Sequence, residues 1–149
     1  MATFFRIVQE RWAATAMDGE GARLYGGRWN PSGLSAVYLA ESRALAALEI
    51  LVHAPREALR LEWRVINVEI PDAWIESAKK LPADWREQPS SVGAQRYGAD
   101  WLRKGTGVAL RLPSVIIPQE SSLLLNPRHG NAAHLKISKP EVFSFDPRL

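Results

Sequence analysis

Glu49 is a carboxylate placed where it could do chemistry. It lies in an Ala- and Leu-rich segment that predicts a helix beginning after Ser42, a residue type favoured at the N-cap. Leu45, Leu48 and Val52 share one face of this helix, and Glu49 stands beside that face, four residues after the first of them. We expect its carboxylate at the edge of the buried stripe, a position from which a carboxylate can take a catalytic role. The alternatives are a side chain that turns to solvent or pairs with a nearby arginine.

The segment Gly26–Gly33 is a second candidate, with three glycines, a proline, Arg28 and Trp29 in eight residues. Glycine lets a backbone approach a ligand closely, arginine offers a fork for phosphate oxygens, and tryptophan can stack on a flat ring. The segment has neither the Gly-Lys-Ser/Thr of a phosphate-binding loop nor the glycine pattern of a dinucleotide-binding fold. It indicates a ligand-binding loop or, alternatively, a tight turn with a structural arginine.

Several kinds of site are excluded or unsupported. The chain contains no cysteine, which excludes disulfides, thiolate metal sites and a cysteine nucleophile. His129 and His134 are five residues apart with no neighbouring carboxylate, so we expect no metal. No Gly-x-Ser-x-Gly motif supports a serine hydrolase.

Composition indicates a globular protein. The chain has 149 residues, of which 46% are hydrophobic and 23% are charged, and this size fits one domain over residues 1–149. Its beginning lacks the pattern of a signal peptide, and no apolar run approaches the roughly 18 residues of a membrane span. We expect no membrane association and a cytoplasmic location.

The net charge of +3 gives little support to nucleic-acid binding. Basic and acidic residues are spread evenly, whereas nucleic-acid binders usually concentrate positive charge on one face. The six tryptophans, some of them interleaved with arginines, could form an RNA surface, but in a domain of this size they more often fill the core.

The predicted elements describe an α+β fold, a mixed or antiparallel sheet with a few inserted helices. Residues 10–35 and 82–89 are expected as loops, and loops as long as the first are often functional. The expected helices are 42–53, 73–80 and 91–104. The expected strands are Thr3–Val8, Ala36–Ala40, Leu61–Ile70, Gly107–Leu112, Val115–Ile117, Ser122–Asn126 and Val142–Phe145.

Five segments in this order resemble the RES domain. They are Gly26–Gly33, Ala36–Ser42, the helix with Ala47-Leu48-Glu49, Leu112-Pro113-Ser114 and Leu125–His129, and the likeness extends from Phe5-Arg6 to the C-terminus. The family is named after an Arg, a Glu and a Ser. It forms the toxin half of bacterial toxin–antitoxin pairs, is similar in fold to ADP-ribosyltransferase toxins, and consumes NAD+.

The resemblance implies a site made of Arg28, Tyr38, Glu49 and Ser114, with Ser121 and Ser122 as alternatives for the serine. Arg28 would hold the pyrophosphate, Tyr38 would stack on nicotinamide or ribose, and Ser114 would hydrogen bond to the ribose or the nicotinamide end. Asn126 and Arg6 are further candidates for the wall of the pocket. Tyr38 and Ser114 rest on the resemblance alone.

The implied chemistry is cleavage of the nicotinamide–ribose bond. Nicotinamide leaves as a neutral ring and needs no general acid, whereas the ribose develops an oxocarbenium-like charge that a carboxylate such as Glu49 can stabilise. NAD+ is then a substrate, and no cofactor is implied. The acceptor stays open among water, phosphate and a protein, the last making the chain an ADP-ribosyltransferase.

The resemblance also implies a partner, an Xre-like helix-turn-helix antitoxin, through which alone nucleic acid would be contacted. Two other classes remain as alternatives. One is an RNA-directed toxin, and the other is a protein-binding module without chemistry whose Gly26–Gly33 loop is a docking surface.

Overall fold

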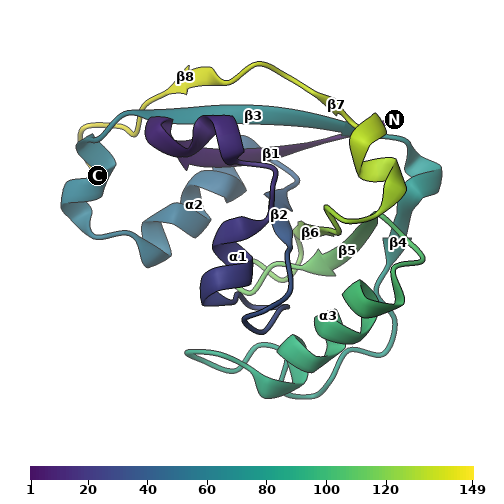
Figure 1. Cartoon of the computed structure of the whole chain (residues 1–149). Helices are drawn as coiled ribbons and strands as arrows, with labels where there is room; N and C mark the ends of the chain where they lie inside the picture. Colours follow the sequence, from purple (N-terminus) through teal and green to yellow (C-terminus); the bar gives the residue numbers. More distant parts are fainter.

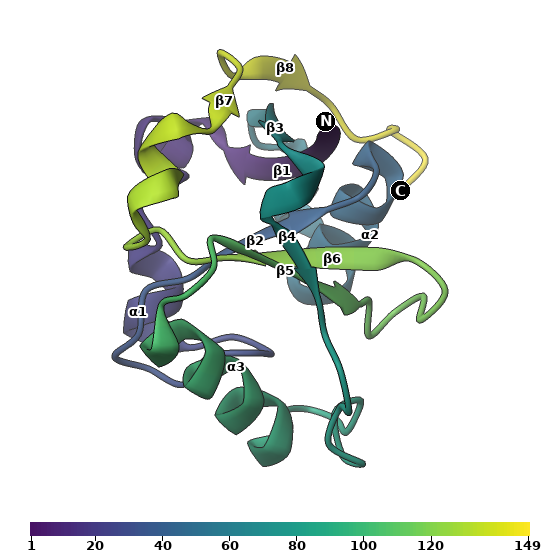
Figure 2. The ribbon, with the colours of Figure 1, turned by 90° about the vertical axis from the view of Figure 1, so that its right-hand side faces the viewer.

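The computed structural model describes residues 1–149 as a strongly bent eight-stranded sheet with helices against it (Figures 1 and 2). The strands follow the order β4-β5-β6-β2-β1-β3-β7, and β8 also pairs with β3. All neighbours are antiparallel except β4 and β5, which confirms the predicted mixed sheet of an α+β fold. The strands are β1 (Ala2–Gln9), β2 (Val37–Ala40), β3 (Trp63–Ile70), β4 (Ile75–Ser77), β5 (Ala109–Pro113), β6 (Ser121–Leu125), β7 (Lys136–Ile137) and β8 (Glu141–Phe143).

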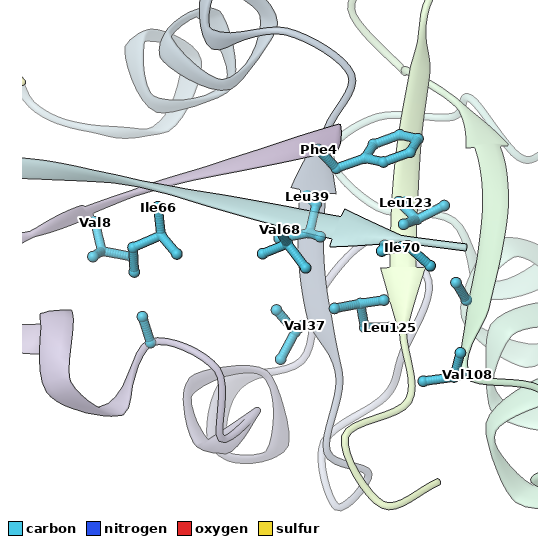
Figure 3. Packing of buried hydrophobic residues seen from close by; sticks show 12 residues of the cluster. Phe4, Val8, Val37, Leu39, Ile66, Val68, Ile70, Val108, Leu123 and Leu125 are labelled. Carbon is cyan, nitrogen blue, oxygen red and sulfur yellow. The ribbon is translucent and has the colours of Figure 1, made fainter. Parts of the chain in front are cut away.

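One face of the sheet carries the largest apolar cluster, which Figure 3 shows. Alternate residues of paired strands form it because successive side chains of a strand point to opposite faces. Phe4 of β1 pairs with Val68 of β3, and Val37 of β2 pairs with Leu125 of β6. Val8 and Ile66 lie side by side in the same cluster (Figure 3). Burial of each such side chain stabilises the fold by roughly 1.5–3 kcal/mol.

The opposite face is covered by two helices, α2 (Arg43–His53) and α3 (Val92–Lys104), both of them predicted. Each begins at a serine whose hydroxyl accepts a backbone N–H, Ser42 from Leu45 and Ser91 from Ala94. Helix α3 ends at Gly105, whose φ of 63° is left-handed. α2 packs over β1 and β3, and α3 packs over β5 and β6, so the two helices flank a common region of this face.

Two predicted elements are wrong. Residues 73–80 form no helix: Asp72–Trp74 is a short 3-10 turn, and Ile75–Ser77 is strand β4, in which Ile75 pairs with Ala109 and packs on the apolar cluster. Val115–Ile117 is a bend rather than a strand, because the N–H groups of Ile116 and Ile117 bond to the hydroxyl of Ser114. Tertiary pairing decides the first case and a local side chain decides the second.

The long segment 10–35 is also more structured than predicted. It contains a 3-10 helix at Glu10–Thr15 and the short helix α1 (Glu20–Tyr25), which leads directly into Gly26–Gly33. Further 3-10 helices lie at Arg56–Arg60 and Gly130–His134. None of the helices combines the length and the apolar character that crossing a membrane requires.

Candidate active site

Ser114 and Glu49 meet at the centre of the candidate site. Ser114 follows β5, is 1% exposed, and accepts the N–H groups of Ile116 and Ile117 at 3.1 Å each. With both acceptor positions occupied, its single O–H is left to donate, and Oε1 of Glu49 accepts it at 3.3 Å. The bend after β5 therefore aims the serine hydroxyl at the carboxylate of α2.

Glu49 lies on the buried face of α2, although that face differs from the predicted one. Leu45 and Ala46 are buried, and Glu49 follows them by four and three residues, whereas Val52 is 57% exposed. The predicted apolar face with Val52 is therefore wrong. The buried face runs through Leu45 and Ala46, and Glu49 lies on this face rather than at its edge. Burial raises the pKa of Glu49, against a smaller lowering by the Ser114 hydrogen bond and by the positive charges of His53 and Arg28.

Arg28 is oriented by the loop at residues 82–89. Its Nη1 donates to the carbonyl oxygens of Trp85, at 3.4 Å, and of Glu87, and its Nη2 donates to Oε1 of Gln88 at 3.2 Å. A guanidinium has five N–H groups, so three of them hold the loop, and the Nε–H and one Nη2–H remain for a ligand. Two such groups suffice for a phosphate, and the charge of Arg28 is felt at both Glu49 and Tyr38.

Tyr38 supports the segment that carries Arg28. Its hydroxyl accepts the N–H of Trp29 at 2.9 Å and donates to Oδ1 of the fully buried Asn30 at 2.6 Å. Burial raises the pKa of Tyr38, which keeps the hydroxyl protonated as a donor. A Cβ on Gly27 would lie 2.8 Å from the same hydroxyl, so the close approach of this loop to Tyr38 requires glycine.

Asn30 is a positioning residue that the sequence reasoning missed. Its Nδ2 donates to the carbonyls of Ala22 and Leu34, at 2.8 and 3.1 Å, which closes the loop on itself. The Asn-Pro dipeptide at 30–31 was a usable signal, because such pairs favour turns. The residues of the 82–89 loop had no comparable signal, since they lie 57 to 60 positions from Arg28.

Arg6 and Asn126 do not join this group. Arg6 alternates with Phe4 and Val8 on the other face of the sheet, where it donates to the carbonyls of Ala16 and Tyr38 at 2.9 and 3.1 Å. Asn126 donates to the carbonyl of Leu102 at the end of α3, at 3.2 Å. Both side chains therefore bind backbone carbonyls and connect strands of the sheet to neighbouring segments of the chain.

Of the six predicted side chains, Ser114 and Glu49 are in direct contact, and Arg28 interacts electrostatically with both Glu49 and Tyr38. Of the three candidate serines, Ser114 is the one that is hydrogen bonded to Glu49, while Ser121 and Ser122 lie in β6 and pair with residues of the neighbouring strands. No three His, Cys, Asp or Glu side chains lie close enough together to hold a metal ion. A half-buried carboxylate with an oriented hydroxyl, near a guanidinium with free donors, can stabilise a developing cation on a phosphate-bearing substrate.

Comparison with known proteins identifies the family of this chain. The family model described as RES domain matches residues 3–146. Toxin Res of Yersinia enterocolitica is 40% identical over 148 residues, covering 97% of each chain. The Prs ADP-ribosylating toxin of a Sphingobium species is 36% identical over 154 residues, covering 99% of this chain and 96% of the other.

A more distant relative is the NAD(+) phosphorylase MbcT of Mycobacterium tuberculosis, 32% identical over 96 residues, which are 58% of this chain and 49% of that one. A chain in the crystal structure of the M. tuberculosis MbcT–MbcA toxin–antitoxin complex has the same fold, with a TM-score of 0.77 and 20% identity over 96% of this chain and 84% of that one. The match over nearly the whole chain and the identity to curated relatives show that this protein is a member of the RES domain family.

Proposed function

We propose that this protein is a toxin enzyme that cleaves the nicotinamide–ribose bond of NAD+ and so arrests growth. The observation that carries the proposal is the hydrogen-bonded pair of Ser114 and Glu49, set near Arg28 on one face of the sheet. The names of the relatives support it, since they include an NAD(+) phosphorylase and an ADP-ribosylating toxin.

Glu49 is the group that would act on the reacting atoms. As nicotinamide leaves, positive charge develops at the ribose carbon and ring oxygen, and an ionised carboxylate stabilises it. The same carboxylate can accept hydrogen bonds from the ribose hydroxyls. Burial raises the pKa of Glu49, and a positive charge that develops beside the carboxylate would favour its ionised form.

The other residues would bind and orient the substrate. The two free N–H groups of Arg28 suit a pyrophosphate oxygen pair. Ser114 would keep the Glu49 carboxylate in place and hydrogen bond to the ribose or nicotinamide end. The ring of Tyr38 would pack against nicotinamide or ribose, while its hydroxyl remains engaged with Trp29 and Asn30. We assign NAD+ the role of substrate and propose no cofactor or metal.

The acceptor of the ADP-ribosyl group defines the second candidate function. The more similar of the two relatives with a named activity is the ADP-ribosylating toxin, which matches 99% of this chain, whereas the phosphorylase matches 58%. This favours testing a protein acceptor beside water and phosphate. The evenly spread charge of the chain gives the RNA-directed alternative no support.

We further propose that an antitoxin inhibits the enzyme in the cytoplasm by covering this site. The proposal is supported by the similar fold of a chain that was crystallised in a toxin–antitoxin complex. The expected antitoxin is Xre-like, with a helix-turn-helix domain that would make the contacts to DNA. Co-expression with a candidate antitoxin should restore growth without changing the amount of toxin.

The experiment that tests the activity measures total cellular NAD+ within minutes of inducing the wild type or Glu49→Ala. Depletion by the wild type alone is the expected result. Growth arrest with unchanged NAD+ would point to modification of a scarce protein target or to RNA. Normal growth and unchanged NAD+ on induction of the wild type would refute the toxin proposal, and a fully toxic Glu49→Ala would refute the role of the carboxylate.

A further inference from the structure

The loop at residues 82–89 is hydrogen bonded to both halves of the candidate site, the segment that carries Arg28 and the bend that carries Ser114. The segment Gly26–Gly33 is attached to it through Arg28, whose Nη1 donates to the carbonyls of Trp85 and Glu87. The loop is also tied to the bend after β5, because Nε of Arg86 donates to the carbonyl of Val115 at 2.9 Å. Arg86 makes the one hydrogen bond between this loop and that bend.

Val115, whose carbonyl accepts this hydrogen bond, adjoins the Ser114–Glu49 pair in the sequence. Val115 directly follows Ser114, whose hydroxyl reaches Glu49 at 3.3 Å. Three hydrogen bonds, joined by the peptide bonds of adjacent residues, therefore connect Arg28 through the loop and Arg86 to Ser114 and Glu49. Movement of the bend relative to the loop would change the separation of these two halves of the site.

The rest of the loop is anchored without Arg86. The Trp85 indole stacks on the buried Trp29 ring with centroids 6.3 Å apart and planes 17° apart. The carboxylate of Asp84 accepts the N–H of Gly93 in the first turn of α3 at 3.0 Å. Arg86 itself is exposed, and a single exposed hydrogen bond contributes little to overall stability. Its contact with Val115 is thus better placed to set geometry than to hold the fold together.

We propose that Arg86 is a positioning residue for NAD+ cleavage, one that sets the separation between Arg28 and the Ser114–Glu49 pair. This inference rests on the proposed function. The pyrophosphate and the reacting ribose are joined by covalent bonds, so the groups that bind them must be held at a matching distance. A misplacement of about 1 Å can lower a rate by about 100-fold. Loss of one of several contacts around the site should have a smaller effect, about 10-fold.

The test compares nicotinamide release by the purified wild type, Arg86→Ala, Arg86→Lys and Arg103→Ala. Arg103 is an exposed arginine on α3 whose side chain makes no hydrogen bond, which makes it a matched control. We expect Arg86→Ala to lower kcat about 10-fold with KM for NAD+ changed less than about 2-fold, because Arg28 keeps all its hydrogen bonds to the loop. Arg86→Lys, which retains a donor for the Val115 carbonyl, should recover most of kcat.

A double-mutant cycle with Ser114→Ala shows whether Arg86 acts through the bend. In that background the additional effect of Arg86→Ala should fall to about 2-fold or less. The same loss of kcat in both backgrounds, or kinetics of Arg86→Ala equal to those of Arg103→Ala, would overturn the inference. So would a loss that lysine does not rescue and that accompanies a lowered melting temperature. An inactive wild type would instead refute the proposed function, and this inference with it.

Discussion

Replacement of Ser114 by alanine tests the central contact of the site most directly. The hydroxyl accepts two N–H groups, from Ile116 and Ile117, and donates to Glu49. Without it, two backbone donors lose their acceptor, at a cost of about 1–3 kcal/mol for each fully buried group. Both isoleucines are only half-buried, so water can replace part of the loss, and we expect about 1–2 kcal/mol in total.

The same substitution should change how activity depends on pH. The Ser114 hydrogen bond lowers the pKa of Glu49, so removing it leaves burial less opposed and the pKa rises further. Because the ionised carboxylate is the active form in the proposed mechanism, the acidic limb of the pH–rate profile should move to higher pH. The two assays are the melting temperature, expected to fall by about 2–8 °C, and nicotinamide release across the pH range.

Ser122→Ala is the control for this prediction. Ser122 lies in β6, and its side chain makes no hydrogen bond, so the same chemical change should leave both measurements close to the wild type. A lowered melting temperature with an unmoved acidic limb would show that Ser114 supports the bend but does not act on Glu49. An unchanged melting temperature would contradict the hydrogen bonds to the bend themselves.

Two further predictions concern the charge of Glu49 and the packing of α3 against Trp29. Since burial raises the pKa of Glu49, the folded protein binds more protons than the unfolded chain, and stability is lost as pH rises from the unfolded value through the folded pKa. Glu49→Gln should therefore melt at a higher temperature than the wild type at neutral pH, and at a similar temperature when the pH is near or below the pKa of the carboxyl in the unfolded chain. Equal melting temperatures of the two proteins at both pH values would contradict this prediction. A Cβ on Gly98 would lie 1.8 Å from the carbonyl oxygen of Trp29, so Gly98→Ala should destabilise by at least about 1–3 kcal/mol in denaturant unfolding, whereas Gly21→Ala in α1, with open space around it, should not.

Local signals in the sequence were sufficient for the two long helices and the two long strands. The serine at 42 with the Ala- and Leu-rich segment after it predicts α2, and the glycine at 105 predicts the end of α3, because caps and helix ends depend on residues within a few positions. The β-branched and aromatic residues of β1 and β3 likewise predict long strands. The same local reasoning brought attention to Arg28 and Glu49, a cation in a glycine-rich loop and a carboxylate beside an apolar stripe.

Tertiary structure alone decided which of these residues meet and what holds them. Ser114 and Glu49 are 65 positions apart, and Arg28 and the loop carbonyls that orient it are 57 and 59 apart. Strand β4 replaced a predicted helix because Ile75 found a partner in β5, and the buried face of α2 turned toward Ala46 rather than Val52. Local preferences amount to tenths of a kcal/mol per residue, whereas burial of one side chain contributes roughly 1.5–3 kcal/mol, so long-range packing determines the outcome wherever the two disagree.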